Sequence, residues 1–108
     1  MADSFEKKER AEEAKFKLDQ ELEFKAESRR NKLLGLWLAE HFGLAGDKAE
    51  AYAKEVVVAD LEEPGIEDIM RKVMADIAAR GTDISEQQVR DKISELMPVA
   101  VQQIQDEI

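Results

Sequence analysis

Cysteine is absent from the sequence, so neither a disulfide framework nor a thiolate metal site can form. Proline and glycine are scarce, with two and five residues among 108. Because these residues interrupt helices, and because Ala, Glu, Lys, Leu and Gln are abundant, the composition favours helix over strand. Histidine occurs only once, as His41, which leaves it without partners for a metal site. We expect no bound metal and a structural or surface role for His41.

Long apolar runs are also missing. No segment approaches the roughly 20 apolar residues that a membrane-spanning helix needs. The beginning of the chain lacks the apolar stretch of a secretory signal. We therefore expect a cytoplasmic protein that does not insert into the membrane.

The chain has no excess of positive charge. Its formal net charge is −9, which argues against nucleic acid as a partner because phosphate would be repelled. Residues 1–32 carry nine basic and nine acidic side chains, whereas residues 33–108 carry seven and sixteen. The N-terminal part is thus neutral but highly charged, and the excess negative charge lies in the remainder.

What the sequence does contain is helical periodicity. We predict an all-α fold, a four-helix bundle over residues 21–108 with a long first helix. Capping-box-like pairs stand at two helix beginnings, Asp47 with Glu50 and Ser85 with Gln88. Pro98 should kink the last helix or begin a new segment. The predicted helices span about 21–42, 47–62, 65–80 and 85–107.

The densest apolar run begins at Leu33 and ends at Phe42. Its apolar residues point in almost every direction around a helix, which is typical of a buried segment. We expect this run to fix the first helix in the bundle. The predicted structural core includes Leu33, Leu36, Trp37, Tyr52 and Val56.

Residues 1–20 are predicted to form a flexible N-terminal arm. Opposite charges four residues apart, such as Glu6 and Arg10, support a helix only weakly. A segment this polar buries too little apolar surface to offset the entropy lost on ordering. Two interpretations remain open, a solvated tail and a segment that folds on a partner.

No catalytic constellation can be assembled from the sequence. A Ser–His–Asp triad would need His41, and the serines occupy caps or polar stretches. Adjacent carboxylates such as Glu62 and Glu63 do not share a helix face, and no glycine-rich phosphate loop is present. We therefore predict that the chain is not an enzyme. One cluster could contact an anion or nucleotide, or could simply pair with acids: Arg29, Arg30 and Lys32.

The stretch 24–37, FKAESRRNKLLGLW, resembles the signature of a known family. Similarity continues with 51–57, AYAKEVV, and 59–65, ADLEEPG, and through 67–73. The segment 8–16, KERAEEAKF, also resembles the family. The family is the zeta subunit of alphaproteobacterial F-type ATP synthases, and the similarity extends over nearly the whole chain.

The resemblance implies an inhibitor of ATP hydrolysis. In that family the arm becomes helical as it inserts between the catalytic subunits and the rotor, and this blocks rotation. The free protein would be a monomer, associated with the inner membrane only through the ATP synthase. Weak adenine nucleotide binding is a further expectation, and no other cofactor is implied. The inhibitory arm would include Phe5, Lys8, Arg10, Ala11, Glu12, Lys15, Phe16, Leu18 and Leu22.

Three positions depart from the family pattern. Glu12 stands where an aromatic residue is usual, which removes an anchor between Phe5 and Phe16. Leu18 stands where a histidine is frequent, which removes a possible pH sensor. Pro98 interrupts a last helix that is usually rich in alanine and glutamate. We expect weaker or less pH-dependent inhibition from the first two changes.

Two alternatives belong to other functional classes. The bundle could be a nucleotide-sensing binding module whose arm is incidental. It could also be a structural adaptor for another assembly.

Overall fold

The structure, a computed structural model, describes the backbone of residues 2–60 and 65–107, and the side chains of these residues from position 20 onward. Within these ranges the chain is all-α, without strands, as predicted. The four helices are α1 (Ala2–His41), α2 (Asp47–Ala59), α3 (Glu67–Ala79) and α4 (Glu86–Glu107). That the N-terminal arm is flexible in the free protein stays a prediction.

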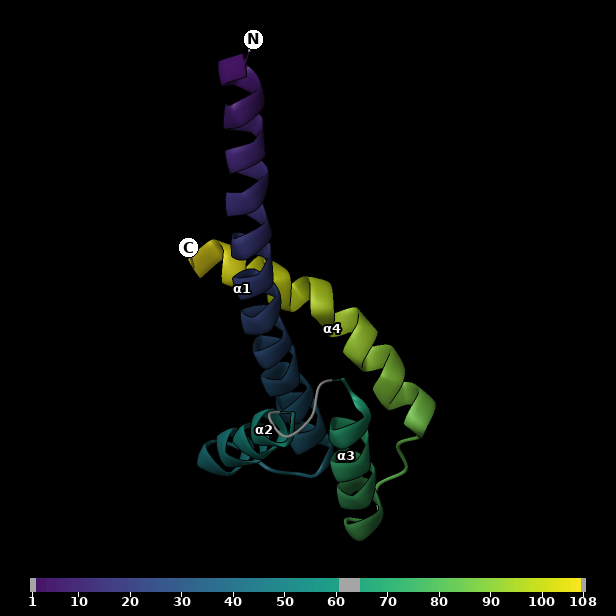
Figure 1. The fold of residues 1–108 in the computed structure, drawn as a ribbon. Helices are drawn as coiled ribbons and strands as arrows, with labels where there is room; N and C mark the ends of the chain where they lie inside the picture. Colours follow the sequence, from purple (N-terminus) through teal and green to yellow (C-terminus); the bar gives the residue numbers. More distant parts are fainter. Residues whose placement is uncertain (1, 61–64, 108) are drawn as a thin grey trace.

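Helix α1 is the axis on which the other helices are arranged (Figure 1). Helices α2 and α4 both pack against its C-terminal half, while α3 contacts α2 and α4. The N-terminal half of α1 projects away from the other helices (Figure 1). The molecule is therefore elongated, with extents of 65 × 26 × 22 Å.

Helix α1 begins far earlier than the predicted residue 21. It is 40 residues long and runs from Ala2 without a break, which corresponds to about 60 Å at 1.5 Å per residue. Few residues in this part interrupt a helix, and its charges alternate in sign at helical spacing. The arm and the first bundle helix are thus one continuous element.

The core is formed by side chains from the C-terminal half of α1 and from the other three helices. Leu34 and Leu38 of α1 are fully buried, and so are Val56, Ile69, Val73 and Val89 from α2, α3 and α4. Tyr52 is also buried, whereas Leu33, Leu36 and Trp37 are half-buried. Trp37 packs against the core from its edge. The inward positions of α1 are therefore Leu34 and Leu38 rather than Leu33 and Leu36, because residues four apart share a helix face.

The two predicted capping boxes have different outcomes. Ser85 and Gln88 form one, since the Gln88 amide donates to Ser85 Oγ at 3.1 Å and the Ser85 amide donates to Gln88 Oε1 at 2.8 Å. The prediction at Asp47 and Glu50 is wrong, because Gly46 is the N-cap of α2 and no side chain caps it. The carboxylate of Glu50 lies instead 3.9 Å from Lys32.

Pro98 lies inside α4 and does not end it. Figure 1 shows α4 as a continuous ribbon whose axis changes direction along its length. Proline removes one backbone hydrogen bond and pushes against the preceding turn, so a bend is its expected effect. No new segment begins at this residue.

Helices α1 and α2 are in close contact at Gly35. A Cβ atom at this position would lie 2.5 Å from Ala53 Cα and 3.1 Å from Ala53 Cβ. The Ala53 contact is with backbone, which cannot rotate away as a long side chain would. The absence of a side chain at position 35 therefore sets the distance between the two helices.

We predict that Gly35→Ala destabilises the protein by about 1–3 kcal/mol through overpacking. The sign of the change in the free energy of unfolding distinguishes overpacking from the usual effect, because an alanine in place of a helical glycine normally stabilises a protein by roughly 1 kcal/mol. Urea unfolding followed by circular dichroism measures the change. A stability equal to or above that of the parent protein would show that the contact is not close-packed.

Helices α2 and α3 are joined by a polar cluster around Tyr52. The phenol donates a hydrogen bond to Asp76 Oδ2 at 2.8 Å, and Lys72 Nζ lies 3.1 Å from the same oxygen. Lys72 Nζ also lies 5.4 Å from the centre of the Tyr52 ring. Burial, and then the hydrogen bond to Asp76, raise the pKa of Tyr52 well above its ordinary value of 10.0.

We predict that native Tyr52 remains protonated beyond pH 10 and ionises only when the protein unfolds. Because its pKa is raised in the folded state, its contribution to stability is complete below pH 10 and is lost as the pH rises further. Tyr52 is the only tyrosine, so the ultraviolet absorbance of phenolate reports it directly. The chain in urea serves as the control and should titrate near pH 10. A native titration that overlays this control would contradict the prediction.

Candidate functional site

The candidate site lies where α1 leaves the bundle. We call residues 24–32 of α1 the base of α1. Phe24, Lys25 and Lys32 are exposed there, while Ala26, Arg30 and Asn31 are buried. Of the predicted arm residues, Leu22 is half-buried. The side chains of the others lie outside the described part of the chain: Phe5, Lys8, Arg10, Ala11, Glu12, Lys15, Phe16 and Leu18.

The three cations predicted as an anion contact do not converge. Arg29 donates to Gln103 at 2.9 Å and to Glu107 at 2.6 Å, both in the last turns of α4. Lys32 faces Glu50 of α2. Arg30 points between the helices and is only 9% exposed. The three side chains therefore reach three different places and do not form a common phosphate site.

Arg30 and Asn31 belong to a buried polar network. Nε and Nη2 of Arg30 each donate to Asn31 Oδ1 at 3.2 Å, and Asn31 Nδ2 donates to Asp60 Oδ2 at 2.8 Å. Nη1 of Arg30 lies 3.9 Å from Met97 Sδ. The network connects α1, the end of α2 and the middle of α4. Asn31 joins the arginine to the carboxylate, since both of its polar atoms are used.

Sequence reasoning missed that Arg30 and Asn31 face inward. Helical spacing offered a signal, because Arg30 lies four residues before Leu34 and Asn31 lies four before Gly35. Their polar character favours the opposite orientation, since arginine and asparagine are mostly exposed in proteins. They are tolerated in this interface because each has hydrogen-bond partners.

We predict that Asn31→Ala lowers the free energy of unfolding by about 2–3 kcal/mol, because it leaves Arg30 and Asp60 with unsatisfied polar groups. Lys32→Ala is the matched control, at an exposed neighbouring position whose one ion pair with a described residue lies at 3.9 Å. It should cost less than about 0.5 kcal/mol. Equal effects of the two substitutions in urea unfolding would contradict the role given to Asn31.

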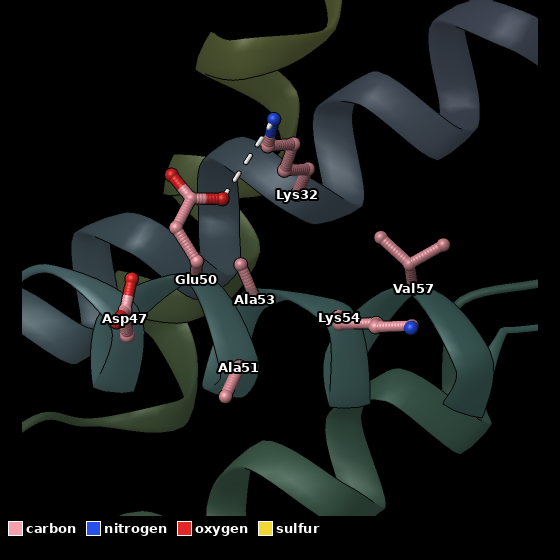
Figure 2. A pocket seen from close by; sticks show the side chains of 7 residues that line it. All are labelled: Lys32, Asp47, Glu50, Ala51, Ala53, Lys54 and Val57. Atoms are coloured by element: carbon pink, nitrogen blue, oxygen red, sulfur yellow. Dashed lines mark ion pairs between the residues drawn. The ribbon is translucent and has the colours of Figure 1, made fainter.

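A hollow lies beside the base of α1, between α1 and α2 (Figure 2). Its volume is about 480 Å³ and its lining is mostly apolar, with Ala51, Ala53 and Val57 among the contributors. Lys32 and Lys54 stand at its rim with Glu50, and Figure 2 shows Lys32 directed toward Glu50. In the described part of the chain, no three potential metal ligands gather.

The fold and this site define a class of protein. A long helix projects from a small helical bundle, and the bundle presents an apolar hollow with charged rims. Recognition in which a helix lies in a groove of another protein is a common mode of protein–protein binding. Among the described helices, none combines the length and apolar composition needed to cross a bilayer.

The chain belongs to the ATPase inhibitor subunit zeta family, whose model matches residues 1–103. The resemblance in the sequence is thereby confirmed. A structure solved by solution NMR is 54% identical to this chain, with a TM-score of 0.72. That match covers 81% of this chain and 99% of the solved one. No curated protein matches the chain.

Proposed function

We propose that this protein inhibits ATP hydrolysis by an F-type ATP synthase. The observation that carries the proposal is the extent of the family match, because residues 1–103 include both the bundle and the projecting half of α1. The partners would be the catalytic subunits and the rotor. The protein would then associate with the inner membrane only through that complex.

The inhibitory element in this proposal is the N-terminal half of α1. It inserts between the catalytic subunits and the rotor, where Phe5, Phe16 and Leu18 act as apolar anchors. Folding on binding costs about 2–5 kcal/mol, so these contacts must exceed that cost. Residues 1–32, which include the arm, carry equal numbers of basic and acidic side chains, and this high charge content keeps the arm soluble before it binds.

Inhibition of this kind needs no chemistry from the inhibitor. A rotary enzyme couples hydrolysis to rotation, so a rigid helix lodged against the rotor stops both. The continuity of α1 supports such a mechanism, because the same helix is fixed by α2 and α4 at one end and free of them at the other (Figure 1). The bundle would remain outside and limit how far the helix enters.

Two residues of the arm set the expected properties of this inhibitor. Glu12 places a charge between Phe5 and Phe16, which weakens the apolar contact of that face. Leu18 replaces a side chain that could titrate near neutral pH. We therefore propose inhibition that varies little between pH 6 and 8 through the arm itself.

We predict that the full-length protein inhibits ATP hydrolysis by the isolated catalytic head and that a version lacking residues 1–18 does not. Loss of the apolar anchors should raise the half-inhibitory concentration by at least about 100-fold, since each anchor of this type is worth around 2 kcal/mol or more. Steady-state hydrolysis with a coupled assay measures both proteins.

Two outcomes would contradict the proposal. If the full-length protein leaves hydrolysis unchanged at saturating concentration, the chain is not an inhibitor of this enzyme. If the shortened protein inhibits equally well, the arm is not the inhibitory element. Circular dichroism of the shortened protein is the control, because its bundle must remain helical for the comparison to hold.

A further inference from the structure

Two adjoining hollows lie beside the base of α1. The hollow between α1 and α2 shares Lys32 and Val57 with a second hollow of about 540 Å³, which extends to Phe24 and to the end of α4 at Ile104. The two hollows therefore form one surface, which we call the α1–α2 groove. It begins at Phe24, next to the projecting half of α1, and ends at Asp47.

The hollow between α1 and α2 is mostly apolar, the second hollow is mixed in character, and one large side chain beside them is unusually exposed. Phe24 is 61% exposed, the most of the large apolar residues in the described part of the chain. A phenylalanine this exposed contributes little to the stability of the free protein, whereas burying its exposed part in a complex gains about 1–2 kcal/mol. Phe24 is thus suited to contact a partner.

Charges of both signs line the rim of the groove, where cations outnumber the acids Asp47, Glu50 and Glu107 by one. Four cations line it, Lys25, Arg29, Lys32 and Lys54, while the whole chain has a net charge of −9. Arg29 pairs with Glu107 and Lys32 faces Glu50. Lys25 and Lys54 are exposed and form no ion pair with any described residue. These two lysines are available to an acidic partner.

We propose that the α1–α2 groove docks an acidic segment of the inhibited ATPase, as a second contact beside the arm. Carboxylates of that segment would pair with Lys25 and Lys54, and an apolar side chain would pack against Phe24 and Val57. This inference rests on the proposed function. It follows from position as well as charge, because insertion of the arm brings the partner's surface to the base of α1.

A docking contact of this kind has a distinct kinetic role. Charges at the rim of an interface mainly increase the association rate and its dependence on salt. The arm then supplies the block, and the groove raises the effective concentration of the arm at its site. Disabling the groove should weaken binding while leaving full inhibition attainable at high inhibitor concentration.

The test compares two full-length variants with the same change of charge. Lys54→Glu reverses a cation on the groove, and Lys48→Glu reverses an exposed cation of the same helix that does not line it. We expect Lys54→Glu to raise the half-inhibitory concentration about five- to tenfold and to reduce its salt dependence, with maximal inhibition unchanged. Lys48→Glu should change the half-inhibitory concentration less than about twofold.

Phe24→Ala tests the apolar contact of the proposed groove. This variant should weaken inhibition without lowering the midpoint of urea unfolding.

A photo-reactive p-benzoylphenylalanine at position 24 identifies what occupies the groove. With the isolated catalytic head as the probe, the expected product joins the inhibitor to a segment of a catalytic-head subunit that is rich in Asp and Glu. A cross-link to a second inhibitor copy, or no cross-link to the catalytic head, would overturn the proposal. So would equal inhibition by Lys54→Glu and Lys48→Glu.

These results separate the docking proposal from the proposed function. If the parent protein does not inhibit, the proposed function fails and the docking proposal fails with it. If the parent protein inhibits and the groove variants inhibit equally well, only the docking proposal fails.

Discussion

The contact between Gly35 and Ala53 is the constraint on which the rest of the structure depends. It lets α2 lie against α1 at backbone distance, and the neighbouring contacts follow from that approach. Asn31 of α1 comes within hydrogen-bonding distance of Asp60 at the end of α2. Tyr52, next to Ala53, is directed to Asp76 of α3. The α1–α2 groove also borders the same contact, since Ala53 is part of its lining.

The charges of the protein divide into two groups with different roles. Arg30 and Asp60 meet through Asn31 at a junction of three helices, where a charge without partners would be costly. Lys25 and Lys54 are exposed at the groove, where water solvates them and a partner can replace that water. The sequence places cations of both kinds within a few residues of each other on α1. On α1, the direction in which each side chain points around the helix decides whether it is buried, as Arg30 is, or exposed, as Lys25 is.

Much of the fold could be predicted from the sequence, and the failures have physical causes. The all-α class, the four helices and the Ser85–Gln88 capping box follow from local periodicity and local hydrogen bonding. The burial of Leu34 instead of Leu33 could not be predicted in this way. Residues 33–39 are apolar in nearly every direction around the helix, so only packing against the neighbouring helices decides which face is buried. Asp47 and Glu50 do not form a capping box because α2 already includes Asp47 and has Gly46 as its N-cap. The candidate site was predicted only in part: the cations of the base were found, but their divergence depends on tertiary packing.

Arg29 gives the end of the chain a mechanical role. It connects α1 to Gln103 and Glu107 in the last turns of α4, about 40 Å along the helix from Ala2 and about 9 Å from Gly35. A sideways force on the tip of α1 therefore acts through a moment arm several times longer than the distance between its two attachments. A small force at the tip therefore becomes a larger force at Arg29. The last turn of α4 thus serves as a brace, and how firmly it binds Arg29 decides whether α1 behaves as a stiff lever or bends at its base.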